Sequence, residues 1–139
     1  MMDVKLPMCL LDWINSDKID WQWMSSVPSE NAMQLVETNL DRINLYCWKE
    51  LSENPSAIHL LKKNQDKINW VGLSSNPSEG AIQLLEKNQN KIHWDWLSSN
   101  TSDRAMQLLE KNQDKINWWS LSKFVSSNCI APSDVFEDK

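Results

Sequence analysis

The strongest constraint on this chain is a string of eight residues that recurs along it. KNQDKINW spans residues 63–70 and 111–118, a close variant spans 87–94, and a looser copy, TNLDRINL, spans 38–45. An isoleucine recurs every 24 or 25 residues in this pattern, giving the series Ile19, Ile43, Ile68, Ile92 and Ile116. A fixed period of this length indicates an array of stacked units, because one unit alone cannot bury its apolar face.

Seven columns of the aligned repeats are apolar in every copy, and we predict that they form the core. The first is the isoleucine column, and the second, two residues on, holds Trp21, Leu45, Trp70, Trp94 and Trp118. Five residues after the isoleucine come Met24, Trp48, Leu73, Leu97 and Leu121. The remaining four columns begin at Ala32, Met33, Leu35 and Val36. Residues so conserved between copies are expected to pack one unit against the next.

Each unit carries start and stop signals for two short helices. A good N-cap residue precedes the first helix in four copies, at Asp20, Asn44, Asn69 and Asn117. Residues 76–79, NPSE, predict an asparagine cap, a proline in the first turn and a capping-box glutamate for the second helix. An asparagine is then expected to close the second helix in the left-handed conformation, at Asn39, Asn64, Asn88 and Asn112.

The unit that starts at Ile43 has three more residues before its proline, Pro55, than the other units have at that point. Three residues add nearly one helical turn, so we predict a longer first helix, Leu45–Glu53, with the stacking preserved. The whole pattern predicts an all-α, right-handed α-solenoid of about four to five short helical hairpins. Residues 1–18 would form an N-terminal capping segment, 19–121 the array, and 122–139 a degenerate last repeat with an acidic tail.

A leucine-rich-repeat-like horseshoe is the alternative fold, because its period is also near 24 residues. Residues 71–76, VGLSSN, resemble the LxLxxN strand of such repeats. The first strand position, however, would hold Gln22, Val71, Asp95 and Trp119 in different copies. A buried strand position does not favour aspartate or glutamine, so the helical hairpin is the better interpretation.

Composition excludes several classes of protein. The chain has 139 residues, a net charge of −5 and a pI of about 5.0, which argues against generic binding to nucleic acid or to an anionic membrane. No apolar run is long enough to span a bilayer, and residues 1–11 lack the pattern of a signal peptide. We therefore expect an intracellular protein and not a secreted one.

Nothing in the sequence suggests catalysis, a cofactor or a metal site. The three cysteines, Cys9, Cys47 and Cys129, are far apart and odd in number, which favours a reducing compartment over a disulfide or zinc framework. No Ser-His-Asp or Cys-His arrangement is recognisable, and a chain whose only glycines are Gly72 and Gly80 has no glycine-rich phosphate loop. We expect a protein that is not an enzyme.

The best candidates for function are positions where otherwise similar repeats differ. They lie one or two residues after the start of each first helix, about 100 to 200 degrees around it from the core tryptophan. Seven of them are candidate partner-binding residues: Gln22, Trp23, Tyr46, Val71, Asp95, Trp96 and Trp119. Exposed tryptophans there would suit a binding hot spot. The alternative is that they pack against the second helix of the same repeat.

A second candidate is a basic ladder near the turn that follows each second helix. It consists of Lys18, Arg42, Lys63, Lys67, Lys87, Lys91, Lys111 and Lys115. It could bind a polyanion such as nucleic acid. We favour instead a solvated edge neutralised by neighbouring acids, among them Asp17, Asp41, Asp66 and Asp114.

The repeat resembles a known type. NPSEGAIQLLEKNQ at 76–89 and KNQDKINWVGLS at 63–74 are similar to the NPxAIxLLxxNxDKIxWxxLSxN repeats of large amoeba-infecting DNA viruses. The resemblance covers residues 19–121 but departs from Asn-Pro at Val27-Pro28 and Asn100-Thr101. The resemblance implies a viral protein, located in the cytoplasm or nucleus of a host cell or in a virion, and it carries no common activity.

The sequence thus predicts a non-enzymatic repeat protein that serves as a protein–protein interaction module. The alternatives are a nucleic-acid-binding or chromatin-associated protein that uses the basic ladder, and a structural virion component. We expect either a monomer or a weak end-to-end oligomer.

Overall fold

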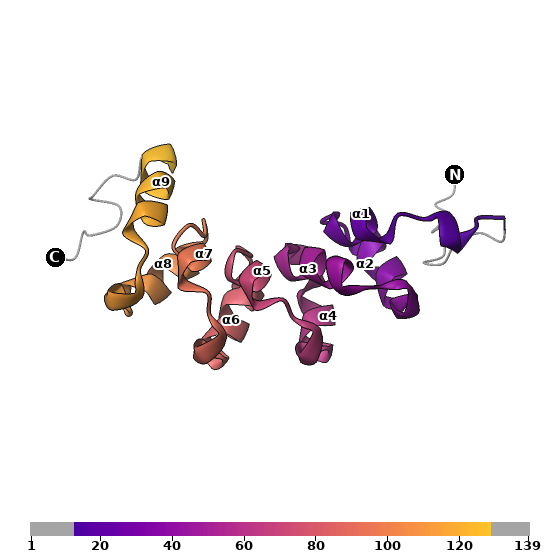
Figure 1. Ribbon diagram of the computed structural model, residues 1–139, viewed down its shortest axis with the longest axis horizontal. Helices are drawn as coiled ribbons and strands as arrows, with labels where there is room; N and C mark the ends of the chain where they lie inside the picture. The colour runs from indigo at the N-terminus through magenta and orange to yellow at the C-terminus, as the bar shows by residue number, and fades with distance from the viewer. Residues whose placement is uncertain (1–12, 129–139) are drawn as a thin grey trace, which may run out of the picture. The chain divides into compact units, whose positions relative to one another are not determined.

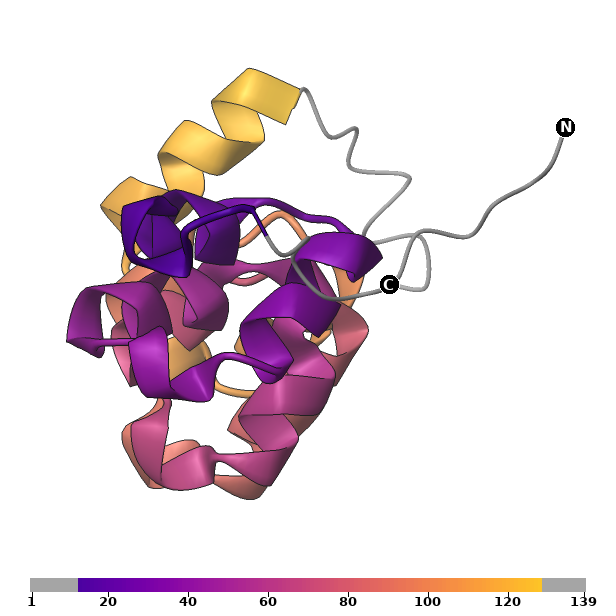
Figure 2. The ribbon, with the colours of Figure 1, turned by 90° about the vertical axis from the view of Figure 1, so that its right-hand side faces the viewer.

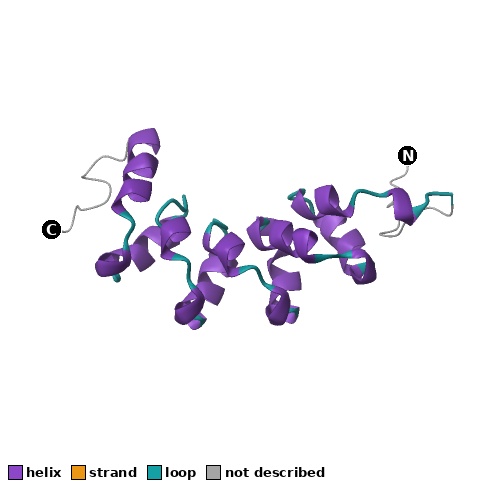
Figure 3. Cartoon of the chain, viewed as in Figure 1, coloured by secondary structure: helices purple, strands orange, loops and turns teal. Residues whose placement is uncertain are grey.

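The computed structural model describes residues 13–128, and Figure 3 shows this part of the chain as helices joined by short loops. The all-α prediction is confirmed. No strand occurs between residues 13 and 128, so the leucine-rich alternative is wrong. Most of the predicted N-terminal cap, with Cys9, and the acidic tail, with Cys129, lie outside the described residues. The chain divides into two compact units, Met1–Asn69 and Trp70–Lys139.

Unit 1 contains two helical hairpins. Its α-helices are α1 (Trp21–Ser26), α2 (Glu30–Glu37), α3 (Leu45–Glu53) and α4 (Ile58–Lys63). Short 3-10 helices precede or link them: η1 (Ser16–Lys18), η2 (Leu40–Arg42), η3 (Pro55–Ala57) and η4 (Gln65–Lys67). The first helices, α1 and α3, pack side by side, and each also packs on the second helix of its own hairpin. Unit 1 is therefore a two-layered stack (Figure 1).

Unit 2 repeats this arrangement with two short first helices and a longer last helix. Its elements are α5 (Trp70–Ser74), α6 (Glu79–Lys87), η5 (Gln89–Lys91), α7 (Trp94–Leu97), α8 (Asp103–Glu110), η6 (Gln113–Lys115) and α9 (Trp118–Asn128). Helix α5 packs on α6 and α7, and α6 packs on α8, so first and second helices again form two layers. In both Figure 1 and Figure 2, α9 projects away from α7 and α8.

The second helices supply most of the predicted core. The alanine column and the last leucine column are buried in every hairpin: Ala32, Ala57, Ala81 and Ala105, then Val36, Leu61, Leu85 and Leu109. The apolar spacing in these helices matches the 3.6-residue period, so one face of each is removed from water. Ile58 and Met106, which share a column with the fully buried Met33 and Ile82, are only half-buried.

Helix α3 has the predicted bounds, but its packing register differs from the predicted one. Ser52 Oγ donates to Trp48 O at 2.8 Å, as Ser25 Oγ donates to Trp21 O in α1. Trp48 therefore occupies the tryptophan position and Leu51 the leucine position, both of them buried. The extra residues lie at the start of α3, which leaves Leu45 82% exposed. The prediction that Leu45 belongs to the core is wrong, because the buried end of the helix sets the register.

The rest of the tryptophan column is less buried than predicted. Trp21 is buried, Trp70 and Trp94 are half-buried, and Trp118 is 59% exposed. The column is therefore only partly core, and its burial decreases along the chain.

The predicted caps of the first helices are confirmed where the structure shows them. Asp20 accepts from Trp23 N–H, Asn44 from Tyr46 and Cys47 N–H, and Asn117 from Ser120 N–H. The N-cap of the second helix is a serine in three hairpins, Ser29, Ser78 and Ser102. The prediction that Asn76 is the N-cap of its helix is therefore wrong. Asn76 lies two residues earlier, is buried, and accepts Ser78 N–H instead.

The asparagines that end the second helices are not left-handed. Asn64, Asn88 and Asn112 have φ between −133° and −135°, and a 3-10 helix follows each of them. Each side-chain amide donates to the carbonyl four residues earlier, as Asn64 does to Leu60 O at 2.9 Å. The side chain thus satisfies a helix-end carbonyl, which removes the need for a left-handed cap.

Candidate functional site

Buried serines join successive repeats. In unit 2, Ser74 Oγ donates to Trp70 O at 2.8 Å and accepts the backbone N–H of His93 at 2.9 Å. Ser98 forms the same pair of bonds with Trp94 O and Asn117 N–H. Each serine therefore ties the end of one first helix to the start of the next.

Buried asparagines form a second set of joints. Asn100 Nδ2 donates to Ser74 O and Asn76 O, each at 2.9 Å, while its Oδ1 accepts Ser102 N–H. In unit 1, Asn54 donates to Ser25 O and Val27 O in the same way. The sequence signal for these joints is the Ser-Ser-Asn or Ser-Glu-Asn that recurs at the end of the first helices.

These joints hold the first helices so that all seven candidate partner-binding residues face solvent. Among them, Trp23 is 63%, Trp96 49% and Trp119 70% exposed. Tyr46, Val71, Gln22 and Asp95 are exposed as well. The alternative, that the tryptophans pack against their own second helices, is wrong.

The candidates fall into two groups rather than one site. The outer surface of unit 1 consists of Gln22 and Trp23 on α1 and Tyr46 on α3. Gln22 Nε2 donates to Glu50 Oε1 at 3.3 Å, which links the two helices at this surface. In the packing register that Ser25 and Ser52 set, Trp23 of α1 corresponds to Glu50 of α3, so the two hairpins differ at this position.

The outer surface of unit 2 consists of Val71 on α5, Asp95 and Trp96 on α7, and Trp119 on α9. Asn117 Nδ2 donates to Asp95 Oδ1 at 2.9 Å. Lys123 Nζ lies 4.1 Å from the centre of the Trp119 ring, one helical turn along α9. Acidic, aromatic and basic groups therefore share this surface.

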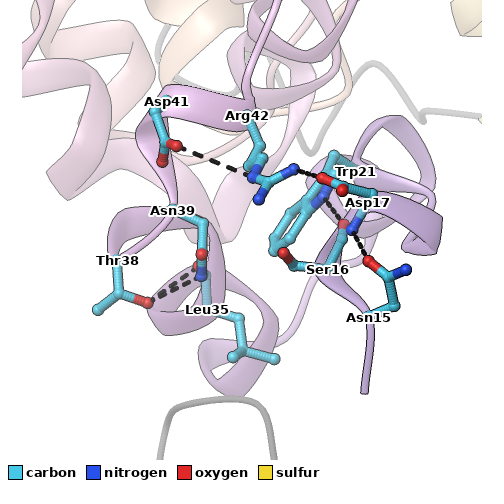
Figure 4. Close-up of polar contacts among 9 residues, drawn as sticks. All are labelled: Asn15, Ser16, Asp17, Trp21, Leu35, Thr38, Asn39, Asp41 and Arg42. Atoms are coloured by element: carbon cyan, nitrogen blue, oxygen red, sulfur yellow. Dashed lines mark hydrogen bonds and ion pairs between the residues drawn. The ribbon is translucent and has the colours of Figure 1, made fainter. Parts of the chain in front are cut away.

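The basic ladder is exposed, and in unit 1 acidic residues neutralise part of it. Arg42 forms an ion pair with Asp17 and a longer one, 3.8 Å, with Asp41 (Figure 4). The Asp17 hydrogen bond raises the pKa of Arg42. Lys63 Nζ lies 3.0 Å from Glu37, and its hydrogen bond lowers the pKa of that carboxyl. The expectation of a neutralised edge holds for these residues.

In unit 2 the ladder contacts aromatic rings instead. Lys91 Nζ lies 5.5 Å from the centre of the Trp70 ring, and Lys115 Nζ lies 5.9 Å from that of Trp94. Within residues 13–128 no ion pair joins Lys115 to Asp114, so the expectation of neutralisation by a neighbouring acid is wrong there. A cation over an indole face is attracted by the ring quadrupole.

Arg104 joins the two second helices of unit 2, which sequence reasoning missed. Its guanidinium on α8 lies 3.0 Å from Glu86 and 3.3 Å from Glu79, both on α6. The Glu86 hydrogen bond raises the pKa of Arg104. The predicted role of Glu79 in a capping box is replaced by this ion pair.

No arrangement for chemistry emerges from the part of the chain that the structure describes. Residues 13–128 contain no group of three or more histidine, cysteine, aspartate or glutamate side chains placed to hold a metal ion. None of the helices between residues 13 and 128 is long and apolar enough to cross a membrane. No family model, curated protein or solved structure matches this chain.

Proposed function

We propose that this chain is a non-enzymatic repeat protein that binds another protein through the outer surfaces of its first helices. Trp96 and Trp119 would be the main contacts in unit 2, and Trp23 with Tyr46 in unit 1. The resemblance to viral repeats adds the proposal that the protein acts in an infected cell or a virion.

The observation that carries this proposal is the exposure of large aromatic side chains on helices that buried serines join by hydrogen bonds. Trp96 and Trp119 stay exposed while Leu97, beside Trp96, is fully buried. Tryptophan and tyrosine are enriched at binding hot spots, since one such side chain can bury a large area with few rotatable bonds.

The hydrogen bonds between repeats favour binding because they hold the helices that carry these side chains in place before a partner binds. Asn117 connects the base of α9 to Ser98 and to Asp95 on α7. Restricting these elements in advance lowers the conformational entropy that binding would otherwise remove.

The test is capture of binding partners by the full chain and by Trp96→Ala and Trp119→Ala. We expect both variants to lose the proteins that the wild type retains, with about a 30-fold weaker affinity for a true hot spot. Trp13→Ala is the matched control, because Trp13 is 80% exposed and belongs to neither outer surface. Equal loss with Trp13→Ala would contradict the proposal.

Folding must be unaffected for this comparison to hold. Because both tryptophans are exposed, each alanine variant should change the melting temperature by no more than about 4 °C. A cooperative loss of helix in either variant would mean that the residue supports the fold rather than a partner.

Polyanion binding through the basic ladder is the second candidate. One observation favours it: Lys87, Lys91, Lys111 and Lys115 are all exposed, and none has an ion pair within residues 13–128. Titrating fluorescent DNA and RNA at about 20 mM salt should show binding that Lys91→Glu with Lys115→Glu removes. No change in anisotropy at that salt concentration would eliminate this function.

A further inference from the structure

The outer surface of unit 1 carries a carboxylate beside two exposed aromatic rings. Trp23 and Glu50 each follow the core tryptophan of their helix, Trp21 or Trp48, by two residues. Both side chains therefore lie about 200 degrees around the helix from that tryptophan, on the outward side. Because α1 and α3 pack side by side (Figure 1), the indole and the carboxylate are neighbours. Tyr46, exposed and one helical turn before Glu50, borders the same carboxylate.

The Glu50 carboxylate is half-buried and has no cation as a partner within residues 13–128. The side-chain hydrogen bond that it accepts there comes from the uncharged amide of Gln22, at 3.3 Å. Lys49, the one basic residue of α3, lies 3.0 Å from Glu53 instead. No ion pair includes Glu50 in that part of the chain. A partly desolvated, unpaired carboxylate attracts an incoming cation more strongly than a fully exposed one does.

The two outer helices of unit 1 also have an acidic balance. With their N-caps, α1 and α3 carry one basic residue, Lys49, and three acidic residues, Asp20, Glu50 and Glu53. A partner that is complementary in charge to this surface is therefore basic.

The outer surfaces of the two units differ in how their aromatic rings meet cations. In unit 2, Lys123 Nζ lies 4.1 Å from the centre of the Trp119 ring, so the chain itself supplies a cation. Within residues 13–128 no lysine or arginine lies over the Trp23 or Tyr46 ring. A cation at these rings in unit 1 would come from a partner.

We propose that the outer surface of unit 1 binds an arginine side chain in a basic segment of another protein. The guanidinium stacks on the Trp23 ring and pairs with the Glu50 carboxylate, while Tyr46 packs against the aliphatic part of the side chain. Arginine fits better than lysine because a planar guanidinium can stack on an indole and donate two parallel hydrogen bonds to a carboxylate. This inference rests on the proposed function, since it names the partner chemistry of a surface assigned there.

The test is fluorescence anisotropy of the full chain with labelled peptides of repeated Gly-Ser-Arg, Gly-Ser-Lys or Gly-Ser-Glu. The arginine peptide should bind with a Kd of about 0.1 mM and the lysine peptide about 5-fold more weakly. Trp23→Ala and Glu50→Gln should each weaken the arginine peptide by about 10-fold. Glu50→Gln should also remove the preference for arginine over lysine. Binding of the glutamate peptide as tight as that of the arginine peptide would overturn the inference.

Two variants serve as matched controls and should bind like the wild type. Glu30→Gln removes the same charge from an exposed residue of α2, and Trp13→Ala removes an exposed tryptophan that belongs to neither outer surface. An equal loss in Glu30→Gln and Glu50→Gln would mean that the peptide responds only to net charge. Circular dichroism of each variant checks that helix content is unchanged. Tighter binding in Lys5→Gln would mean that the chain's own lysine competes for the surface, and would overturn its assignment to a partner.

Failure of this inference and failure of the proposed function give different results. If Trp23→Ala loses proteins that the wild type captures while the arginine peptide does not bind, the surface binds a partner of another chemistry and this inference alone is overturned. If no variant of an outer tryptophan loses a captured protein, the proposed function is overturned and this inference with it.

Discussion

The two units use one repeat position in different ways. In unit 1 the basic residue at the end of η2, Arg42, pairs with Asp17 in the preceding 3-10 helix. In unit 2 the equivalent Lys115 has Asn90 at the place of Asp17, and it lies over the Trp94 ring. The basic residue at this repeat position therefore forms an ion pair in unit 1 and a cation–π contact in unit 2, while the repeat is kept.

A second difference between the units lies in one first helix, α3 of unit 1. The longer α3 places Trp48 and Leu51 in the core and Leu45 in solvent, whereas α5 and α7 begin directly with the core tryptophan. The buried end of the helix, which carries the serine, therefore sets the packing register. Extra residues are added where they can be exposed.

The largest expected effect tests this register. Leu51→Ala in unit 1 and Leu97→Ala in unit 2 should each lower the free energy of unfolding by about 3 kcal/mol, because both side chains are fully buried. Leu45→Ala should cost less than about 0.5 kcal/mol. Urea denaturation measures all three. A large loss for Leu45→Ala would restore it to the core and contradict the register.

The next effect concerns the asparagine joints. Asn100→Ala leaves Ser74 O and Asn76 O without their donor, so it should destabilise unit 2 by about 2 to 3 kcal/mol. Asn54→Ala should do the same in unit 1. Thermal denaturation measures the loss. Asn112→Ala removes one bond from a half-buried side chain and should cost about 1 kcal/mol or less. If Asn112→Ala is as damaging as Asn100→Ala, the joints have no special role.

A smaller effect separates the two kinds of cation contact. Lys115→Met should lower stability by about 0.5 to 1 kcal/mol, with little dependence on salt, because the lysine contacts an uncharged ring rather than a carboxylate. Arg42→Met removes an exposed ion pair, so its effect should shrink as salt increases. Unfolding at about 0.05 M and 1 M NaCl makes the comparison. Identical salt dependence in the two variants would mean that the units do not differ in this respect.

The smallest effect is a pH dependence confined to unit 1. Lys63, followed by smaller contributions that include His59, holds the pKa of Glu37 below 4.5 in the folded chain. Between the folded and unfolded pKa values the unfolded state binds more protons, so stability rises with pH. The contribution is present above pH 4.5 and is lost as the pH falls through the folded pKa. It should be below about 1 kcal/mol, since the side chain is partly exposed.

Glu37→Gln should remove that dependence, and Glu30→Gln serves as the control on the same helix. Stability curves from pH 3 to pH 7 would show it as a smaller slope in the Glu37 variant alone. Identical slopes in wild type and Glu37→Gln would contradict the role of the Lys63 contact.

Much of the site could be predicted because it follows from local pattern. The exposure of Trp96 and Trp119 follows from their angle around the helix relative to the core tryptophan. The wrong assignment of one core residue has a structural cause. Leu45 was assigned to the core by counting from the isoleucine, but the packing register is fixed from the other end of the helix by Ser52. The spacing of residues along the sequence does not show which end of a helix is held in place by tertiary contacts.

The sequence alone determined the hairpins, the caps of the first helices and the length of α3, since these depend on residues within a few positions of one another. The tertiary structure decided which polar groups form hydrogen bonds between neighbouring repeats and which lysines lie over a tryptophan ring. Asn100 bonds residues 24 and 26 positions away, and Asn54 bonds residues 27 and 29 positions away. Such contacts form only when the hairpins stack. Stacking removes water from these buried polar groups, so each must find its hydrogen-bond partner in the neighbouring repeat.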